Sequence, residues 1–174
     1  VMQQTAETVD MPVKPQDHEA YRRLIAATEG IPAARTVVAH PCDATSLEGA
    51  LDAMDANIIV PILVGPKARI LAAAESLGRS LDGIEIVETE HSHASAEKAV
   101  ALIREGAGEF LMKGSLHSDE LLGAVTSRDK GLRTERRISH VFAMAVPTYS
   151  QPLFITDAAV NIFPDLDAKR DIVQ

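Results

Sequence analysis

Residues 109–122 read EFLMKGSLHSDELL, and this stretch decides which fold the sequence predicts. An apolar run at 110–112 predicts a buried strand, which ends in the lysine, glycine and serine of 113–115. A histidine follows, and the acidic and leucine residues of 118–122 predict the start of a helix. A strand that passes through a glycine turn into a helix is typical of α/β proteins.

The same alternation of strand and helix recurs on both sides of this stretch. Apolar runs bounded by glycine or proline predict strands at 34–41, 57–66, 83–89, 109–113, 137–147 and 151–160. Helical spacing of apolar residues predicts helices at 17–30, 43–56, 67–78, 92–106, 118–129 and 165–174. Strands that are apolar throughout favour a doubly wound, mostly parallel open sheet with helices on both faces. Pro61 is an irregularity that predicts a break or bend in its strand.

Length, charge and composition narrow the class of protein. The chain has 174 residues and a net charge of −8, which argues against nucleic acid as a partner. The single Cys42 excludes an internal disulfide and fits a reducing, cytoplasmic compartment. No apolar run approaches the roughly 20 residues of a bilayer-spanning helix, and the first residues lack a signal-peptide pattern. We therefore expect a cytoplasmic protein with no membrane partner.

The domain organisation is predicted from composition and from the last helix. Residues 1–16 are polar with two prolines and predict a linker or disordered lead-in. We expect a first α/β domain at 17–146 and the start of a second, truncated domain at 147–174. A helix of about two turns is marginal by itself, so we expect the chain to be part of a longer polypeptide.

The turn after the 109–113 strand has the chemistry of a phosphate site. Parallel sheets bind ligands at the carboxyl ends of their strands, where this turn is predicted to lie. Gly114 permits close approach of the backbone, Lys113 supplies a charge, and Ser115 and His117 supply hydrogen-bonding groups. The following helix offers free N–H groups, although the spacing is not that of a Walker motif. The alternative is an ordinary turn in which Ser118 caps the helix.

The stretch GLRTERRISHVF at 131–142 contributes a second set of candidates. Arg137 lies at the start of the predicted strand, and Ser139 lies on the same side of an extended chain. Arginine binds phosphate through a planar two-pronged fork. Arg133 and Arg136 fit a solvated turn instead. We therefore predict that Arg137 and Ser139 line a binding cleft.

The stretch ITDAAVNIFPDL at 155–166 contributes the third set. Thr156, Asp157 and Asn161 follow an apolar strand. Aspartate and asparagine commonly form local turns, which is the alternative here. A role in a site requires these side chains to face the same cleft as the loop at 113–117.

A metal or dinucleotide site receives little support. His91 and His93 form an HxH pair, as in some zinc sites, but no third ligand follows at suitable spacing. Ser92 or Ser95 suits a helix cap instead. Cys42 lacks an activating cation, apart from one nearby histidine, and is predicted to be structural. No GxGxxG motif is present, so dinucleotide binding is not indicated.

Five stretches together resemble the phosphate acetyl/butyryltransferase family, also called phosphotransacetylase-like. They are RTVVAHPCDATSLEGALDA (35–53), IIVPILVGPKARI (58–70), LMKGSLHSDELL (111–122), GLRTERRISHVFAM (131–144) and PLFITDAAVNIFPDL (152–166). Their order and spacing make the resemblance specific, and it runs from Tyr21 to Gln174. Within this family the sequence most resembles the phosphate butyryltransferase-like branch. That branch includes proteins in which this region follows an enoyl-CoA hydratase-like domain.

The resemblance implies acyl transfer between coenzyme A and inorganic phosphate, with no metal or redox cofactor and with CoA as a substrate. It implies a homodimer of two-domain subunits with the active site between the domains. The residues it implies in the cleft are Lys113, Gly114, Ser115, His117, Arg137, Ser139, Thr156, Asp157 and Asn161. Family members are longer, and a serine–arginine–aspartate set implicated in catalysis lies in their C-terminal half. The resemblance therefore implies an incomplete two-domain acyltransferase fold that supplies one wall of the site.

Two other classes of function stay open at this point. The chain is also compatible with a non-catalytic α/β domain that binds phosphate or a phosphorylated ligand. It is compatible as well with another α/β enzyme that acts on phosphorylated metabolites. The sequence does not distinguish acetyl from butyryl as the transferred group.

Overall fold

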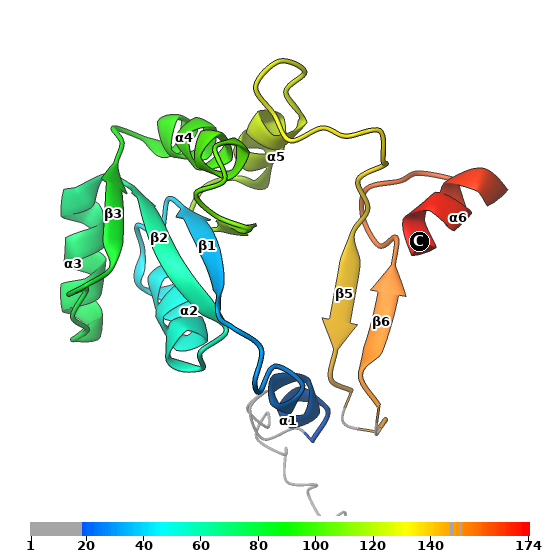
Figure 1. Cartoon of the computed structure of the whole chain (residues 1–174), viewed down its shortest axis with the longest axis horizontal. Helices are drawn as coiled ribbons and strands as arrows, with labels where there is room; N and C mark the ends of the chain where they lie inside the picture. The colour runs from blue at the N-terminus through cyan, green and yellow to red at the C-terminus, as the bar shows by residue number, and fades with distance from the viewer. Residues whose placement is uncertain (1–18, 147, 150) are drawn as a thin grey trace, which may run out of the picture. The chain divides into compact units, whose positions relative to one another are not determined.

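The computed structural model describes residues 19–146, 148–149 and 151–174 (Figure 1). The lead-in predicted at 1–16 and the first two residues of the helix predicted at 17–30 lie outside the described residues. Two compact units can be distinguished. The larger unit is Ile31–Glu135, and the other combines α1 (Glu19–Ala26) with Arg136–Gln174. Each of the two units contains one sheet.

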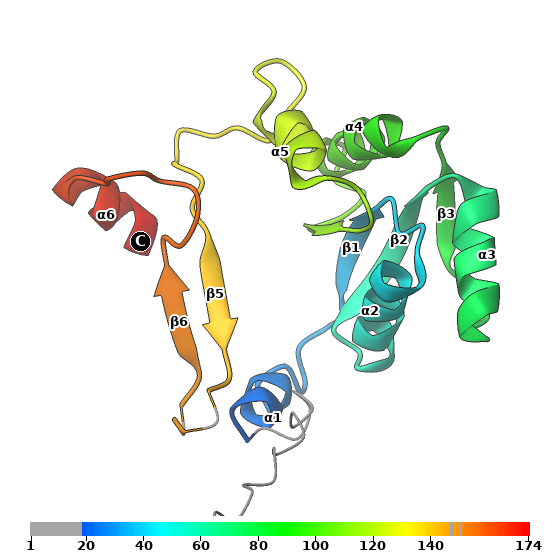
Figure 2. The same cartoon turned by 180° about the vertical axis from the view of Figure 1, so that it is seen from behind.

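The larger unit is built on a four-stranded parallel sheet. Its strands are β1 (Ala34–Ala39), β2 (Ile59–Gly65), β3 (Glu85–Glu88) and β4 (Phe110–Lys113). Their order is β3-β2-β1-β4, and every pairing is parallel. The chain therefore steps outward from β1 to β3 and then returns to the other side of β1 (Figures 1 and 2). This reversal makes β1 and β4 the switch point of the sheet.

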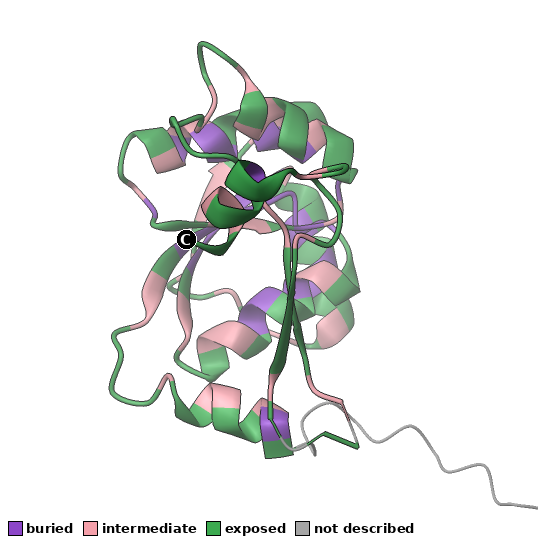
Figure 3. Ribbon diagram, turned by 90° about the vertical axis from the view of Figure 1, so that its right-hand side faces the viewer, coloured by how far each residue is buried: buried purple, intermediate pink, exposed green. Residues whose placement is uncertain are grey.

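Helices cover both faces of this sheet, as the alternation of its side chains requires. The helices are α2 (Ala44–Asp55), α3 (Lys67–Leu77), α4 (Ser92–Arg104) and α5 (Ser118–Thr126). Val38 of β1 packs with α2 and α3, whereas its neighbours Val37 and Ala39 pack with α4 and α5. Figure 3 shows buried residues gathered on strands and on the facing sides of helices. The predicted doubly wound α/β fold is confirmed.

Pro61 does not break its strand, so that prediction is wrong. β2 runs without interruption from Ile59 to Gly65, and Pro61 lies opposite Thr36 of β1. Pairing with β3 begins at the next residue, Ile62. The proline therefore lies where β2 has a neighbour on one side only, and there a missing N–H costs no ladder hydrogen bond.

The second unit contains an antiparallel pair of strands. β5 (Val141–Met144) and β6 (Leu153–Thr156) pair with Met144 opposite Leu153. All eight strand residues are exposed (Figure 3). The predicted boundary at residue 146 would put the two strands in different domains, although they form one hairpin here. The domain boundaries themselves stay a prediction.

Local features mark where several helices begin and end. α6 (Leu166–Val173) begins directly after its N-cap residue Asp165, whose carboxylate accepts a hydrogen bond from Ala168 N at 2.8 Å. α3 ends at Gly78, which takes the left-handed conformation that glycine tolerates best. α1 ends four residues before the predicted Gly30. Among the described residues, no helix has the length and hydropathy needed to cross a bilayer.

Candidate functional site

The ends of β1 and β4 lie side by side at the carboxyl edge of the larger unit's sheet. Ala39 is opposite Lys113 in the parallel register, so the loops after these residues start as neighbours. The loop at 40–43 leads into α2, and the loop at 114–117 leads into α5. Because α2 and α5 cover opposite faces of the sheet, the two loops lead away from each other, which is the arrangement of the switch points where α/β sheets bind ligands.

Hydrogen bonds hold the two loops together before they diverge. Gly114 N donates to Ala39 O at 2.8 Å, and Ser115 N and Oγ both donate to His40 O, at 2.8 and 2.9 Å. The Ser115 hydroxyl also accepts from Cys42 N at 3.1 Å. A Cβ on Gly114 would lie 2.5 Å from Ala39 O. Gly114 and Ser115 therefore set the position of the loop relative to β1.

Lys113 and His117 flank this fixed segment and are exposed. Lys113 Nζ donates to Gly114 O at 3.2 Å and takes part in none of the ion pairs found in the described part of the chain. His117 is the N-cap residue of α5, and Ser118 is its first residue, so the part of the alternative that makes Ser118 the cap is wrong. The structure brings Lys113, Gly114, Ser115 and His117 together in one loop.

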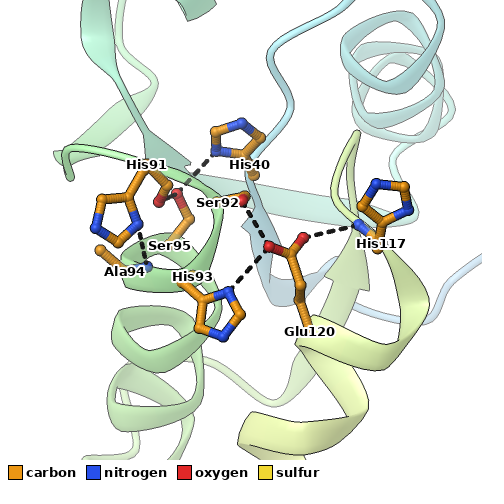
Figure 4. A network of polar contacts seen from close by, with 8 residues as sticks. All are labelled: His40, His91, Ser92, His93, Ala94, Ser95, His117 and Glu120. Carbon is orange, nitrogen blue, oxygen red and sulfur yellow. Dashed lines mark hydrogen bonds and ion pairs between the residues drawn. The ribbon is translucent and has the colours of Figure 1, made fainter.

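Glu120 joins this loop to the start of α4 (Figure 4). One carboxylate oxygen accepts from His117 N at 3.0 Å. The other accepts from Ser92 Oγ at 2.8 Å and lies 3.0 Å from His93 Nδ1. The Ser92 hydroxyl, then His93 and His117 N, lower the pKa of Glu120 to about 2. The carboxylate therefore ties together the N-termini of α4 and α5.

This tie predicts how stability depends on pH. The pKa of Glu120 is lower in the folded state than its usual value of about 4.3. Its stabilising contribution is therefore complete above that usual value and is lost as the pH falls toward about 2. We expect Glu120→Gln to flatten the acid limb of the unfolding free energy, measured by urea denaturation between pH 2 and 7. Glu97→Gln, at an exposed residue of α4, is the matched control, and equal acid limbs in both variants would contradict the prediction.

The two histidines of the HxH pair lie at the start of α4 and make different contacts. His91 is the N-cap residue, and its Nδ1 accepts from Ala94 N at 3.2 Å. The predicted caps Ser92 and Ser95 are therefore wrong: Ser92 bonds to Glu120, and the Ser95 hydroxyl donates back to His91 O at 2.9 Å. Within the described residues, no group of three or more histidine, cysteine, aspartate or glutamate side chains is placed to hold a metal ion.

His40 lies buried at the end of β1 and links four elements. Its N donates to Val64 O at 2.7 Å, and its carbonyl accepts from Ser115. Its Nδ1 lies 2.9 Å from Ser95 Oγ (Figure 4), and its Nε2 lies 3.4 Å from Arg69 Nη1. Burial, followed by the charge of Arg69, lowers the pKa of His40. His40 therefore connects β1, β2, α3 and α4 to the loop at 114–117.

In the second unit, a hydrogen-bonded loop brings three predicted residues together. Asp157 follows β6, and its carboxylate accepts from the backbone N–H groups of four residues and from the Asn161 side chain. Asn161 Oδ1 accepts from Arg137 Nη1 at 3.1 Å. These contacts, with the Asn161 side chain first, hold the pKa of Asp157 far below its usual range. Asp157 thus organises the loop, while the exposed Arg137 guanidinium is oriented by Asn161.

The two other residues predicted in this unit do not join that arrangement. No hydrogen bond links the side chain of Ser139 or Thr156 to Arg137, Asp157 or Asn161 in the described part of the chain. Thr156 is the last residue of β6 and is exposed. The two sets of candidates belong to different units. A single site that contains both sets stays a prediction.

A cavity of about 480 Å³ lies between α4 and α5. Glu120 and His93 line one part of it, and Val100 and Ala124 form part of its apolar wall. None of the residues that the sequence predicted for the site lines this cavity. Its only link to the loop at 113–117 is therefore the contact between Glu120 and His93.

Sequence analysis missed three residues at the carboxyl edge of the sheet: His40, Arg69 and Glu120. His40 follows a buried strand directly and precedes a proline, which marks it as a strand-end residue. Glu120 stands three residues after His117, the spacing of a capping box with histidine in place of serine or threonine. No local pattern marks Arg69, because its contact with His40 joins residues 29 positions apart.

Comparison with curated proteins finds clear relatives, although no family model matches the chain. The chain is 59% identical over 160 residues, 92% of its length, to a phosphate acetyltransferase from Rhizobium meliloti. It is 32% identical over 89% of its length to a phosphate butyryltransferase from Clostridium acetobutylicum. The matches cover 51% and 52% of those proteins, so the chain spans about half the length of the curated relatives it matches.

Solved structures give the same fold. A phosphotransacetylase from Staphylococcus aureus superposes with a TM-score of 0.65 at 14% identity, over 87% of this chain and 55% of that one. A branched-chain phosphotransacylase from Enterococcus faecalis V583 superposes with a TM-score of 0.58 at 19% identity, over 80% of this chain and 48% of that one. These likenesses confirm the fold class. None of the relatives named here is described as a fusion with an enoyl-CoA hydratase, so that possibility stays a prediction.

Proposed function

The chain is homologous to phosphate acetyltransferases and phosphate butyryltransferases, and we propose that it supplies one wall of the active site of a phosphate acyltransferase. The reaction is acyl-CoA plus phosphate to acyl phosphate plus CoA. The observation that supports this proposal most strongly is the 59% identity to a phosphate acetyltransferase over 92% of the chain. The loop at 114–117, which hydrogen bonds hold against β1 at the switch point of the sheet, supports the proposal because α/β sheets bind ligands at such points.

The proposed chemistry needs groups that this loop offers. A phosphate oxygen attacks the thioester carbonyl, the C–S bond breaks, and CoA leaves as a thiolate. In the reverse direction the CoA thiolate attacks the acyl phosphate, and phosphate leaves. Negative charge develops on the carbonyl oxygen, and preorganised donors stabilise it. Lys113 provides a cation and His117 a hydrogen-bonding side chain at this edge, while Ser115 holds the loop against β1. The chemistry requires no metal or redox cofactor.

The rest of the assignment belongs to the same proposal. Acetyl is the favoured acyl group, because identity to the acetyltransferase from Rhizobium meliloti exceeds identity to the butyryltransferase from Clostridium acetobutylicum. We place the enzyme in the cytoplasm as a homodimer, with CoA and phosphate or acyl phosphate as its ligands. The single cysteine supports a reducing compartment. The second candidate function is a non-catalytic phosphate-binding domain, and the loop at 113–117 supports it equally.

A chimera separates the two functions. In it, this chain replaces the matching segment of the Rhizobium meliloti relative, so that the remainder of the fold is present. We expect phosphate-dependent release of CoA thiol from acetyl-CoA, measured with a thiol reagent, and slower release from butyryl-CoA. A folded chimera that binds phosphate and releases no thiol would favour the non-catalytic domain.

A further inference from the structure

Two cations at the carboxyl edge of the larger unit's sheet have no carboxylate partner. Arg69, in the first turn of α3, and Lys113, at the end of β4, take part in none of the ion pairs found among the described residues. Elsewhere in this chain arginines do pair with carboxylates, for example Arg79 with Asp55 at 2.7 Å and Arg136 with Asp171 at 2.6 Å. Unpaired cations at a switch point, in a chain of net charge −8, suit an anionic ligand.

Arg69 is held by a neutral histidine. A guanidinium has only donors, so the Nε2 atom of His40 must be the acceptor in their 3.4 Å contact. The proton of the neutral ring therefore lies on Nδ1, which donates to Ser95 Oγ at 2.9 Å. The Ser95 hydroxyl can accept this bond because it donates to His91 O. The buried imidazole is thus fixed in one tautomer, with its acceptor facing Arg69.

The register of the sheet places the two cations on either side of β1's end. Lys113 is opposite Ala39, and Arg69 contacts His40, the next residue along β1. The Ser46 hydrogen bonds lower the pKa of Asp43 most, and the charges of Lys113 and Arg69 lower it further, so both cations act on the same point of this edge. One carboxylate, Asp43, is near both cations, but it caps α2 by accepting from Ser46 N at 2.8 Å and pairs with neither.

We propose that Arg69 and Lys113 together bind a phosphate group at the switch point, with His40 as the positioning residue that orients Arg69. Arginine offers a planar fork to phosphate, and lysine adds a point charge from the other side. The subsite rests on the proposed function, since phosphate is a substrate of that reaction. It also adds to it, because it assigns a phosphate contact to α3.

Direct binding of inorganic phosphate tests the subsite without requiring activity. The 174-residue chain, labelled with ¹⁵N, is titrated with phosphate at constant ionic strength, and Kd is taken from amide shifts. We expect Arg69→Ala to weaken binding about ten- to a hundredfold, the range for a charge-assisted contact. Lys67→Ala is the matched control, because it removes an exposed cation two positions away on the same helix. We expect its Kd to match that of the wild type.

Two substitutions at His40 separate positioning from folding. His40 has a φ of 57°, a left-handed conformation that asparagine tolerates. His40→Asn keeps a donor near Ser95 but removes the acceptor for Arg69, so we expect weak phosphate binding in a stable fold. His40→Gln extends to the Nε2 position and keeps that acceptor, so we expect phosphate binding near the wild-type level even where the melting temperature falls.

The outcomes are distinguishable. Equal weakening by Arg69→Ala and Lys67→Ala, or no phosphate-induced shift in the wild type, overturns the subsite, while thiol release by the chimera still judges the acyltransferase proposal. Loss of phosphate binding in His40→Gln but not in His40→Asn overturns the positioning role. Competition with acetyl phosphate assigns the subsite to the transferred phosphate, whereas competition with adenosine 3′,5′-bisphosphate assigns it to a phosphate of CoA.

Discussion

Replacing Gly114 by alanine is expected to destabilise the larger unit by about 3 kcal/mol, because the new methyl group has no room. Its Cβ would lie 2.5 Å from Ala39 O and 2.6 Å from His40 C. Both are backbone atoms, so no side-chain rotation relieves the overlap. The Gly114 N–H bond to Ala39 O holds the loop at this distance, and the overlap would break it. We expect a large fall in the urea midpoint followed by circular dichroism.

Gly123→Ala is the matched control for this substitution. Gly123 lies inside α5, and a Cβ there meets nothing within 4 Å. Alanine is the better helix former by about 1 kcal/mol, so this variant should be more stable than the wild type. The two glycine-to-alanine changes therefore have opposite expected signs. A Gly114→Ala protein as stable as the wild type would show that the loops after β1 and β4 are not in close contact.

The second large effect is expected on substrate binding when Lys113 or Arg137 is replaced by alanine in the chimera. In the proposed site each would contribute a charge-assisted contact, a kind of contact worth about 1.5–3 kcal/mol, so KM for phosphate or for CoA should rise about ten- to a hundredfold. Arg137→Lys should recover only part of the loss, because lysine lacks the planar fork. Steady-state kinetics with each substrate varied in turn measure the effect.

Two controls make the kinetic result specific. Arg133→Ala removes an exposed cation four positions before Arg137 and should leave both KM values unchanged. Arg137 also donates to Asn161, which helps to organise the loop after β6, so melting temperatures must accompany the kinetics. Unchanged KM values in both Lys113→Ala and Arg137→Ala would remove these residues from the site.

Much of the fold was predictable from sequence because its strands are continuous apolar runs. Runs such as 57–66 alternate with helical patterns, and that alternation alone indicates a doubly wound sheet. The pairing of β5 with β6 was not predictable, since both runs read as strands and nothing local shows which strand each one joins. The effect of Pro61 depends on where β3 begins to pair, which is also non-local.

The loop of the candidate site was predictable from sequence, but the hydrogen bonds that hold this loop in place were not. The lysine, glycine and serine of 113–115 stand out because they follow a buried strand. Their supports are contacts between distant residues: Ser115 with His40 is 75 positions apart, and Ser92 with Glu120 is 28. Caps were missed for a different reason. Ser92 and Ser118 are the usual cap type, but His91 and His117 occupy the cap positions.

The central claim is the proposal that these 174 residues supply one wall of the active site of a phosphate acetyltransferase. The most direct test is the kcat/KM of the chimera for acetyl phosphate and CoA, measured beside the intact Rhizobium meliloti relative by the formation of acetyl-CoA. The account predicts values of the same order for the two proteins, because the exchanged segments are 59% identical. A chimera that folds with the stability of its parent and forms no acetyl-CoA would contradict it.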